Sequence, residues 1–126
     1  MIGPFAAGQE KKPAPQQQQQ APPEEDEQEK PKEYSFNPLQ AEKEMRVGNF
    51  YFHKGDFRAA ANRFREATNW NPTAPEPYLR LGESEEKQRS WKAAREAYEK
   101  FLELAADDKR APEVRKKLEK ISKDKH

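Results

Sequence analysis

Cysteine is absent from this chain of 126 residues, and histidine occurs only twice. Without cysteine the chain has no disulfide framework, no thiolate nucleophile and no thiol that could carry a lipid anchor. The two histidines, His53 and His126, do not have the spacing of a histidine pair in a metal site. Glycine-rich phosphate loops and calcium-binding loops are missing as well. We therefore expect no enzyme activity, no metal and no cofactor.

Acidic residues cluster at Glu83, Glu85 and Glu86. Paired carboxylates can serve as a general acid and a general base, which makes this cluster the nearest approach to a catalytic site. Carboxylates at neighbouring positions of a helix point in different directions, however. The cluster is therefore expected to form a solvated helix face.

Long hydrophobic runs and a large excess of one charge are also lacking. Hydrophobic residues make up 33% of the chain, and no stretch approaches the roughly 20 apolar residues of a membrane helix. Charged residues make up 37%, yet their formal sum is only +1. Such a chain has no basic field that would hold nucleic acid. We expect a protein or peptide partner, with no nucleic acid and no direct membrane insertion.

Residues 1–33 differ in composition from the rest of the chain. They carry six of the eleven prolines, the glutamine run 16–20 and the acidic stretch 24–29. A segment so poor in apolar residues cannot offset its chain entropy, so it is predicted to be a disordered tether. The alternative is a docking tail, in which "KPAP" or "APPEE" is bound by another protein.

The first residues, "MIGPFAAGQ", resemble the cleavage end of a secretory signal. They lack a basic start and a long apolar core, so the sequence as written predicts a cytoplasmic protein. A signal truncated at its start would instead make the protein periplasmic. An upstream hydrophobic extension with basic residues would decide between the two.

From Asn37 onward the sequence predicts helices separated by turn signals. The expected ranges are about 38–53, 57–71, 74–88 and 91–105, followed by a short helix within 109–123. The expected N-caps are Asn37 with Gln40, Asp56, Thr73 with Glu76, and Ser90. The second, fourth and last of these helices carry apolar residues at steps of three and four, so each of them must bury one face.

One helix-pair pattern occurs twice at an offset of 34 residues. A single helix pair cannot cover its own apolar face, and a second copy stacked on it buries that face. The recurring pairs are Gly48 and Gly82, Phe57 and Trp91, Ala60 and Ala94, and Phe64 and Tyr98. The small residues are expected where paired helices cross, with the large aromatics filling the space they leave.

These residues resemble the tetratricopeptide repeat family. The first repeat, 41–74, matches the family at Gly48, Tyr51, Gly55, Phe57, Ala60, Phe64, Ala67 and Pro72. The second repeat, 75–108, keeps Tyr78, Leu81, Gly82, Ala94 and Tyr98, and departs at Glu85 (usually aromatic), Arg89 (turn glycine), Phe101 (small) and Ala106 (proline). The resemblance implies an all-α domain over 34–126, with two helix-turn-helix repeats and a C-terminal capping helix over 109–123.

The resemblance also implies a binding surface, because family members receive peptides on the concave face formed by the first helix of each repeat. Carried over by position, this face contains Glu42, Met45, Asn49, Phe52 and His53, and then Glu76, Leu79, Glu83, Glu86 and Lys87. It is expected to be apolar at one end and acidic at the other, and so to prefer basic peptide residues. Members that clamp a C-terminal carboxylate have a lysine where this chain has Met45, whereas Asn49 matches their asparagine.

Aromatic residues exceed what one helix pair can bury. Phe50, Tyr51 and Phe52 point in directions about 100° apart on a helix. Either the preceding segment, with Tyr34, Phe36 and Leu39, or a second protomer is expected to cover the excess. Trp70 is expected to seal the loop between the repeats, with stacking on a ligand as the alternative.

The sequence as a whole predicts a protein-interaction adaptor. One alternative is a component of a bacterial envelope assembly, similar to the repeat-containing assembly lipoproteins of the outer membrane. The other is a self-associating scaffold, for which the native mass would be that of a homo-oligomer.

Overall fold

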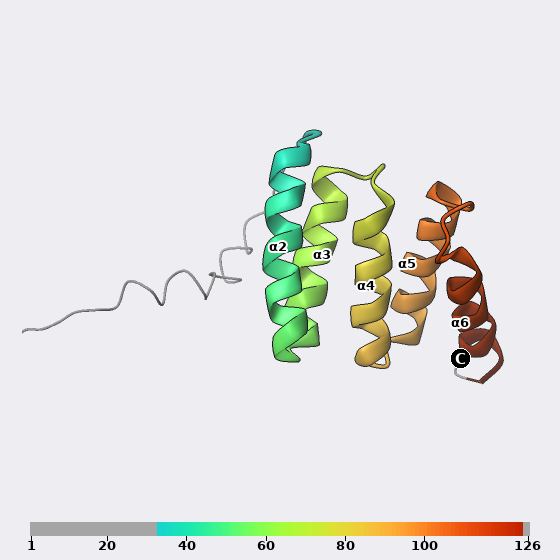
Figure 1. Ribbon diagram of the computed structural model, residues 1–126. Helices are drawn as coiled ribbons and strands as arrows, with labels where there is room; N and C mark the ends of the chain where they lie inside the picture. Colours follow the sequence, from blue (N-terminus) through green and yellow to red (C-terminus); the bar gives the residue numbers. More distant parts are fainter. Residues whose placement is uncertain (1–32, 125–126) are drawn as a thin grey trace, which may run out of the picture. The chain divides into compact units, whose positions relative to one another are not determined.

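The computed structural model describes residues 33–124. This part of the chain is all-α, with five helices that lie side by side in the order of the sequence (Figure 1). They are α2 (Pro38–Lys54), α3 (Phe57–Trp70), α4 (Pro75–Lys87), α5 (Trp91–Leu104) and α6 (Ala111–Asp124). Each helix packs chiefly against its neighbours in sequence, so the predicted succession of helical hairpins is confirmed. The tether predicted for 1–33 lies, except for Glu33, outside the described residues.

The first two helices begin with the caps that the sequence predicts. The Asn37 side chain accepts a hydrogen bond from the Gln40 amide at 3.1 Å, and Asp56 accepts one from the Ala59 amide at 3.2 Å. The capping box at Asn37 is only half formed, because the Gln40 side chain donates to Glu44 instead. The Asn37 amide is satisfied by the carbonyl of Trp70 at 2.9 Å, which ties the start of α2 to the end of α3.

The cap predicted for α4 is wrong, and the one predicted for α5 is in place but makes no side-chain hydrogen bond. The Thr73 hydroxyl donates to the Asn71 side chain at 3.0 Å, and α4 begins after Ala74 without a side-chain cap. The reason is that Pro75 and Pro77 have no N–H, so the first turn has fewer amides for a cap to satisfy. Ser90 is the N-cap residue of α5, as predicted, but its side chain bonds to none of the amides of the first turn.

The turns that end α2 and α4 have the same backbone geometry. Gly55 has φ +83°, and Arg89, at the same place in the second helix pair, has φ +61°. The amides of Gly55 and Arg89 bond to carbonyls three residues earlier, at 3.0 and 2.9 Å. Arg89 therefore adopts a left-handed conformation that suits glycine and strains a residue with a Cβ.

Replacing this strained residue, as Arg89→Gly, should stabilise the protein. The left-handed conformation costs an arginine roughly 1–2 kcal/mol. Glycine avoids this cost, but it also increases the conformational entropy of the unfolded chain, which offsets part of the stabilisation. We expect a net increase of about 0.5–1 kcal/mol in the free energy of unfolding, measured by urea denaturation. Gly55→Ala is the matched control and should lower stability, and an Arg89→Gly variant less stable than the parent would refute the strain at this turn.

Helices cross closely where the sequence places glycine. A Cβ built on Gly48 would lie 2.5 Å from Cε1 of Phe64, and one built on Gly82 would lie 2.5 Å from Cε1 of Tyr98. Both rings are fully buried. The predicted filling of each crossing by an aromatic from the partner helix is therefore confirmed.

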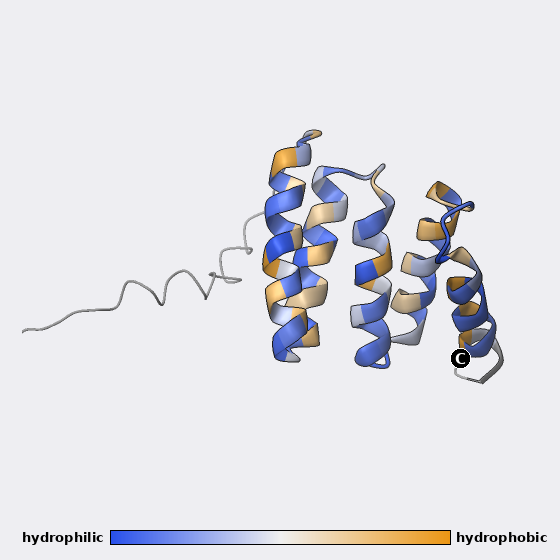
Figure 2. Cartoon of the chain, viewed as in Figure 1, coloured by the Kyte–Doolittle hydropathy of each residue, from blue (hydrophilic) through white to orange (hydrophobic). Residues whose placement is uncertain are grey.

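The buried side chains form two clusters, and the first joins the two helix pairs. Leu81 of α4 and Ala97 of α5 pack with Ala60, Ala61 and Phe64 of α3. The second cluster continues to α6 and consists of Leu79, Ala94, Tyr98, Phe101, Val114 and Ile121. Hydrophobic residues accordingly alternate with polar ones along each helix (Figure 2). The apolar core thus runs along the whole row of helices.

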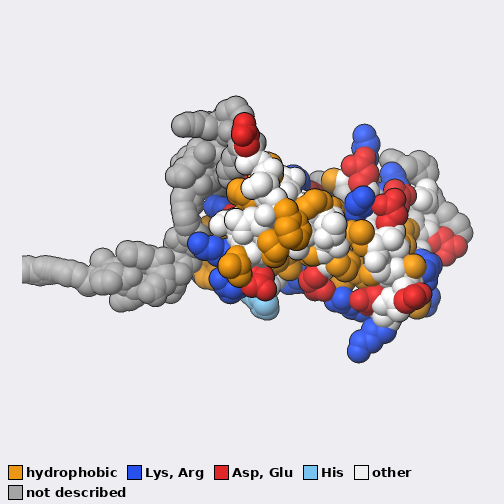
Figure 3. All heavy atoms as spheres, turned by 90° about the horizontal axis from the view of Figure 1, so that it is seen from above, with side chains coloured by type: hydrophobic (Ala, Val, Ile, Leu, Met, Phe, Trp, Pro, Cys, Tyr) orange, Lys and Arg blue, Asp and Glu red, His pale blue; other side chains and the backbone are white. Residues whose placement is uncertain are grey.

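Some large hydrophobic side chains stay exposed, namely Tyr34, Phe36, Leu39 and Leu104. Figure 3 looks along the helices from above, onto the side of the row where α2 begins, and hydrophobic side chains gather on that side among separate charges. Leu39 is 75% exposed and Phe36 is 67% exposed. Phe36 in the segment before α2 and Leu39 in the first turn of α2 therefore contribute little to the core.

Candidate functional site

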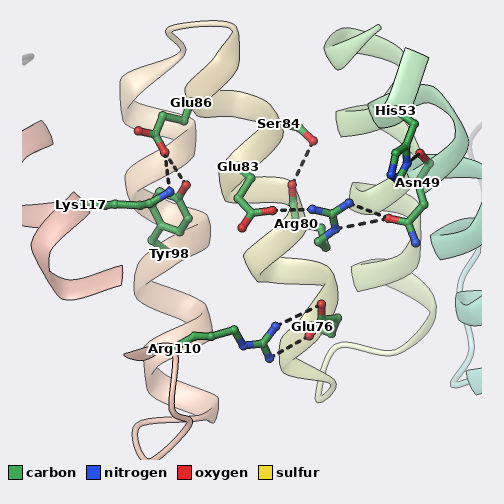
Figure 4. Close-up of polar contacts among 10 residues, drawn as sticks. All are labelled: Asn49, His53, Glu76, Arg80, Glu83, Ser84, Glu86, Tyr98, Arg110 and Lys117. Atoms are coloured by element: carbon green, nitrogen blue, oxygen red, sulfur yellow. Dashed lines mark hydrogen bonds and ion pairs between the residues drawn. The ribbon is translucent and has the colours of Figure 1, made fainter. Parts of the chain in front are cut away.

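Arg80 of α4 lies at the centre of the predicted binding face (Figure 4). Its Nη2 donates to the Asn49 side chain of α2 at 3.0 Å, and its Nη1 donates to Glu83 at 2.6 Å. Its guanidinium carbon lies 4.4 Å from the ring centroid of Phe52. Arg80 thus brings three of the predicted residues together and joins α2 to α4.

The sequence prediction did not include Arg80. Its pairing with Glu83 at a spacing of three on a helix was a usable signal. The bonds to Asn49, by contrast, join residues 31 apart and depend on how the helix pairs stack.

The face is not acidic at one end, so that prediction is wrong. Glu76 is paired with Arg110 at 2.9 Å, and Glu83 with Arg80. Glu86 accepts a hydrogen bond from the Tyr98 hydroxyl at 2.5 Å and lies 3.5 Å from Nζ of Lys117 (Figure 4). The cations Arg80, Arg110 and Lys117 come from α4 itself, from the residue before α6 and from α6, and they compensate the negative charge of these carboxylates.

The contact with Glu86 also affects Tyr98. Burial raises the pKa of the Tyr98 hydroxyl well above its usual range, and the hydrogen bond to Glu86 raises it further. Tyr98 therefore stays a neutral donor at ordinary pH and holds Glu86 over the α5 side of the face.

The acidic cluster is not a solvated helix face either. Glu85 is only 5% exposed and forms an ion pair with Arg65 of α3. Its position corresponds to the half-buried Tyr51 of the first helix pair. Because that position points toward the preceding helix pair, the carboxylate needs a partner there, and Arg65 provides one.

The other predicted site residues differ in exposure. Leu79 is 4% exposed and belongs to the core, so it offers little surface to a ligand. Met45 is half-buried against the first core cluster. Glu42 and His53 are exposed, and Nδ1 of His53 lies 2.9 Å from the backbone oxygen of Asn49.

The aromatic residues of α2 are covered differently from the prediction. Phe52 packs edge-on against Phe57 of α3 at a centroid distance of 5.0 Å. Tyr34 packs against Trp70 at 4.9 Å, while Phe36 remains exposed. The preceding segment therefore packs on the end of α3, and Trp70 supports that contact. Cover by a second protomer stays a prediction.

A cavity of about 580 Å³ opens on the predicted face. Four predicted residues line it, together with three that the sequence prediction missed. The lining consists of Phe52, Glu83, Glu86 and Lys87, with Arg89, Trp91 and Lys117. Trp91 was identified as a core repeat position, and Arg89 as a departure from the turn glycine, but neither pattern indicated a site. The cavity thus lies at the end of α2 and α4 where the Gly55 and Arg89 turns follow.

Residues 33–124 contain neither a candidate metal site nor a candidate membrane-spanning helix. No group of three or more acidic or histidine side chains in this part is placed to hold a metal ion. No helix here is long and apolar enough to span a bilayer.

Comparison of the sequence with known protein families and with curated proteins gives no match.

Proposed function

We propose that the chain is a helical-repeat adaptor of the tetratricopeptide type. It binds a peptide, or an extended segment of another protein, on the face formed by α2, α4 and α6. The cavity carries this proposal, because four of the residues assigned to the binding face by resemblance line it. The cavity has aromatic side chains for an apolar anchor and charged groups for orientation, which is the usual composition of a peptide site.

The repeated geometry supports the tetratricopeptide assignment. The contact between Gly48 and Phe64 in the first helix pair recurs as the contact between Gly82 and Tyr98 in the second, and both residues lie at the same offset along the chain. The Gly55 and Arg89 turns repeat the same hydrogen bonds as well. Repeating units that stack in this way leave the first helices of each pair in a continuous row.

Selection from a random peptide library displayed on phage tests the proposal directly. The absence of cysteine allows a blocking group to be placed at one chosen position. In the full chain, Lys87→Cys labelled with a bulky maleimide should weaken binding of the selected peptides about ten-fold or more, because the label fills the cavity. Affinity is measured by fluorescence anisotropy.

Lys92→Cys, labelled identically, is the matched control. Lys92 is exposed on α5 and does not line the cavity, so its label should leave affinity unchanged. Circular dichroism of both labelled proteins shows whether the fold is intact. The proposal fails if selection enriches no peptide, or if the two labels have equal effects.

A further inference from the structure

We propose that this cavity selects a partner segment in which carboxylates flank an apolar or aromatic side chain. The inference rests on the proposed function and specifies the chemistry of the segment. It is opposite to the preference for basic peptides that the sequence alone predicts.

The carboxylates of the cavity are already engaged. Glu83 is held by Arg80 at 2.6 Å. Glu86 accepts from the Tyr98 hydroxyl at 2.5 Å and lies 3.5 Å from Lys117. Because Arg80 and Lys117 already compensate these negative charges, a basic ligand gains less from an added ion pair here than it would from uncompensated carboxylates. The carboxylates of the cavity therefore offer little net negative charge to select a cationic ligand.

Two cations on the rim are not engaged by a carboxylate among the described residues. Lys87 is exposed, and its Nζ lies 5.6 Å from the ring centroid of Phe57. Arg89 is exposed in the turn between α4 and α5. No ion pair within residues 33–124 involves either side chain. Both are therefore available to a carboxylate of a ligand.

The apolar side of the cavity is formed by Phe52 and Trp91. Phe52 is fixed between Phe57, at a centroid distance of 5.0 Å, and the guanidinium of Arg80. A rigid aromatic wall beside cations suits an apolar side chain with acidic neighbours, because the two parts of the ligand contact different parts of one cavity.

A second cavity continues the same charge pattern toward α6. It has a volume of about 250 Å³ and shares Glu83 and Lys117 with the first. Its other lining residues are Leu79, Lys109, Arg110, Glu113 and Val114. Among the charged side chains of the two linings, three cations form no ion pair within residues 33–124, namely Lys87, Arg89 and Lys109, against one such carboxylate, Glu113. An extended acidic segment can therefore follow the face from α2 to α6.

The test uses short synthetic peptides with a fluorescent label and the full chain. One phenylalanine is flanked on both sides by glutamates, by glutamines or by lysines, and a further peptide has alanine between the glutamates. The glutamate peptide with phenylalanine should bind about ten-fold tighter than the glutamine or lysine peptide, because it gains exposed ion pairs with the free cations. It should also bind tighter than the alanine peptide, and its affinity should fall as salt increases.

The double variant Lys87→Gln with Arg89→Gln should remove most of the preference for glutamates. The matched control is Lys92→Gln with Arg58→Gln, which removes the same charges from exposed positions outside both cavities and should keep the preference. Both variants are compared with the parent by urea denaturation, so that loss of the fold is distinguished from loss of binding.

Several results would overturn the inference. The inference fails if the lysine peptide binds as tightly as the glutamate peptide or more tightly. It also fails if both double variants lose the preference for glutamates to the same extent. Tighter binding of a single-stranded oligothymidylate at the same cavity would indicate a nucleic-acid surface instead. If no synthetic peptide binds but phage selection yields peptides that the Lys87 label blocks, the charge preference is wrong and the proposed adaptor function stands.

Discussion

A Gly82→Ala variant should be less stable than the parent, although alanine is the better helix former. The added Cβ would lie 2.5 Å from Cε1 and 2.6 Å from Cδ1 of Tyr98. The tyrosine is fully buried and its hydroxyl is held by Glu86, so the ring has little room to move. Overpacking costs about 1–3 kcal/mol, against about 1 kcal/mol gained from helix propensity. Because contacts of 2.5 and 2.6 Å place the overpacking cost in the upper part of that range, about 2–3 kcal/mol, we expect a net loss of roughly 1–2 kcal/mol in urea denaturation.

A double-mutant cycle with Tyr98→Leu isolates the steric contribution at this crossing. Tyr98→Leu alone should destabilise the protein, since it leaves a void and removes the bond to Glu86. In its presence Gly82→Ala should cost little or even stabilise, because the shorter side chain leaves room for the methyl group. A Gly82→Ala protein as stable as the parent would contradict the close approach of α4 and α5.

The helices were predictable because their signals are local. Asn37 and Asp56 cap through amides three residues away, and the Gly55 turn needs only a left-handed glycine. The crossings were predictable for a related reason. Gly48 and Gly82 recur at the offset of their aromatic partners, so one contact in the first helix pair implies the other in the second.

The charged contacts between helices were not predictable in the same way. Arg80 reaches Asn49, and Lys117 reaches Glu86, over 31 residues in both cases. A sequence shows how many charges a face has, but not which cations from other helices come within bonding distance. For this reason the face was expected to be acidic, whereas each of its carboxylates at Glu76, Glu83 and Glu86 has a partner.

The cavity was partly predictable. Phe52 and Lys87 were assigned to the face by position, and both line it. Leu79 was assigned in the same way but packs into the core, because it meets α6, whose Val114 and Ile121 cover it. The rim residue Arg89 was noticed as an unsuitable turn residue, and its position beside the cavity depends on the path of the turn between α4 and α5.

The ion pair between Arg65 and Glu85 should respond unequally to loss of either partner. The Glu85 side chain is 7% exposed, whereas that of Arg65 is 46% exposed. Arg65→Met would leave a buried carboxylate with a single neutral donor, Nε2 of Gln88 at 3.2 Å. We expect a loss of about 2–3 kcal/mol in the free energy of unfolding, because an uncompensated buried charge is expensive. Urea denaturation at neutral pH measures it.

Glu85→Gln should cost much less, about 1 kcal/mol or below, because it removes the buried charge and leaves a guanidinium that water can solvate. The same substitution made on top of Arg65→Met should restore part of the lost stability, since the side chain that lacks a partner is then neutral. Lys92→Met, which breaks the exposed pair with Glu96, is the control and should change stability little. Equal losses for Arg65→Met and Glu85→Gln would show that the pair behaves as a surface ion pair, and that burial of Glu85 does not determine its energetics.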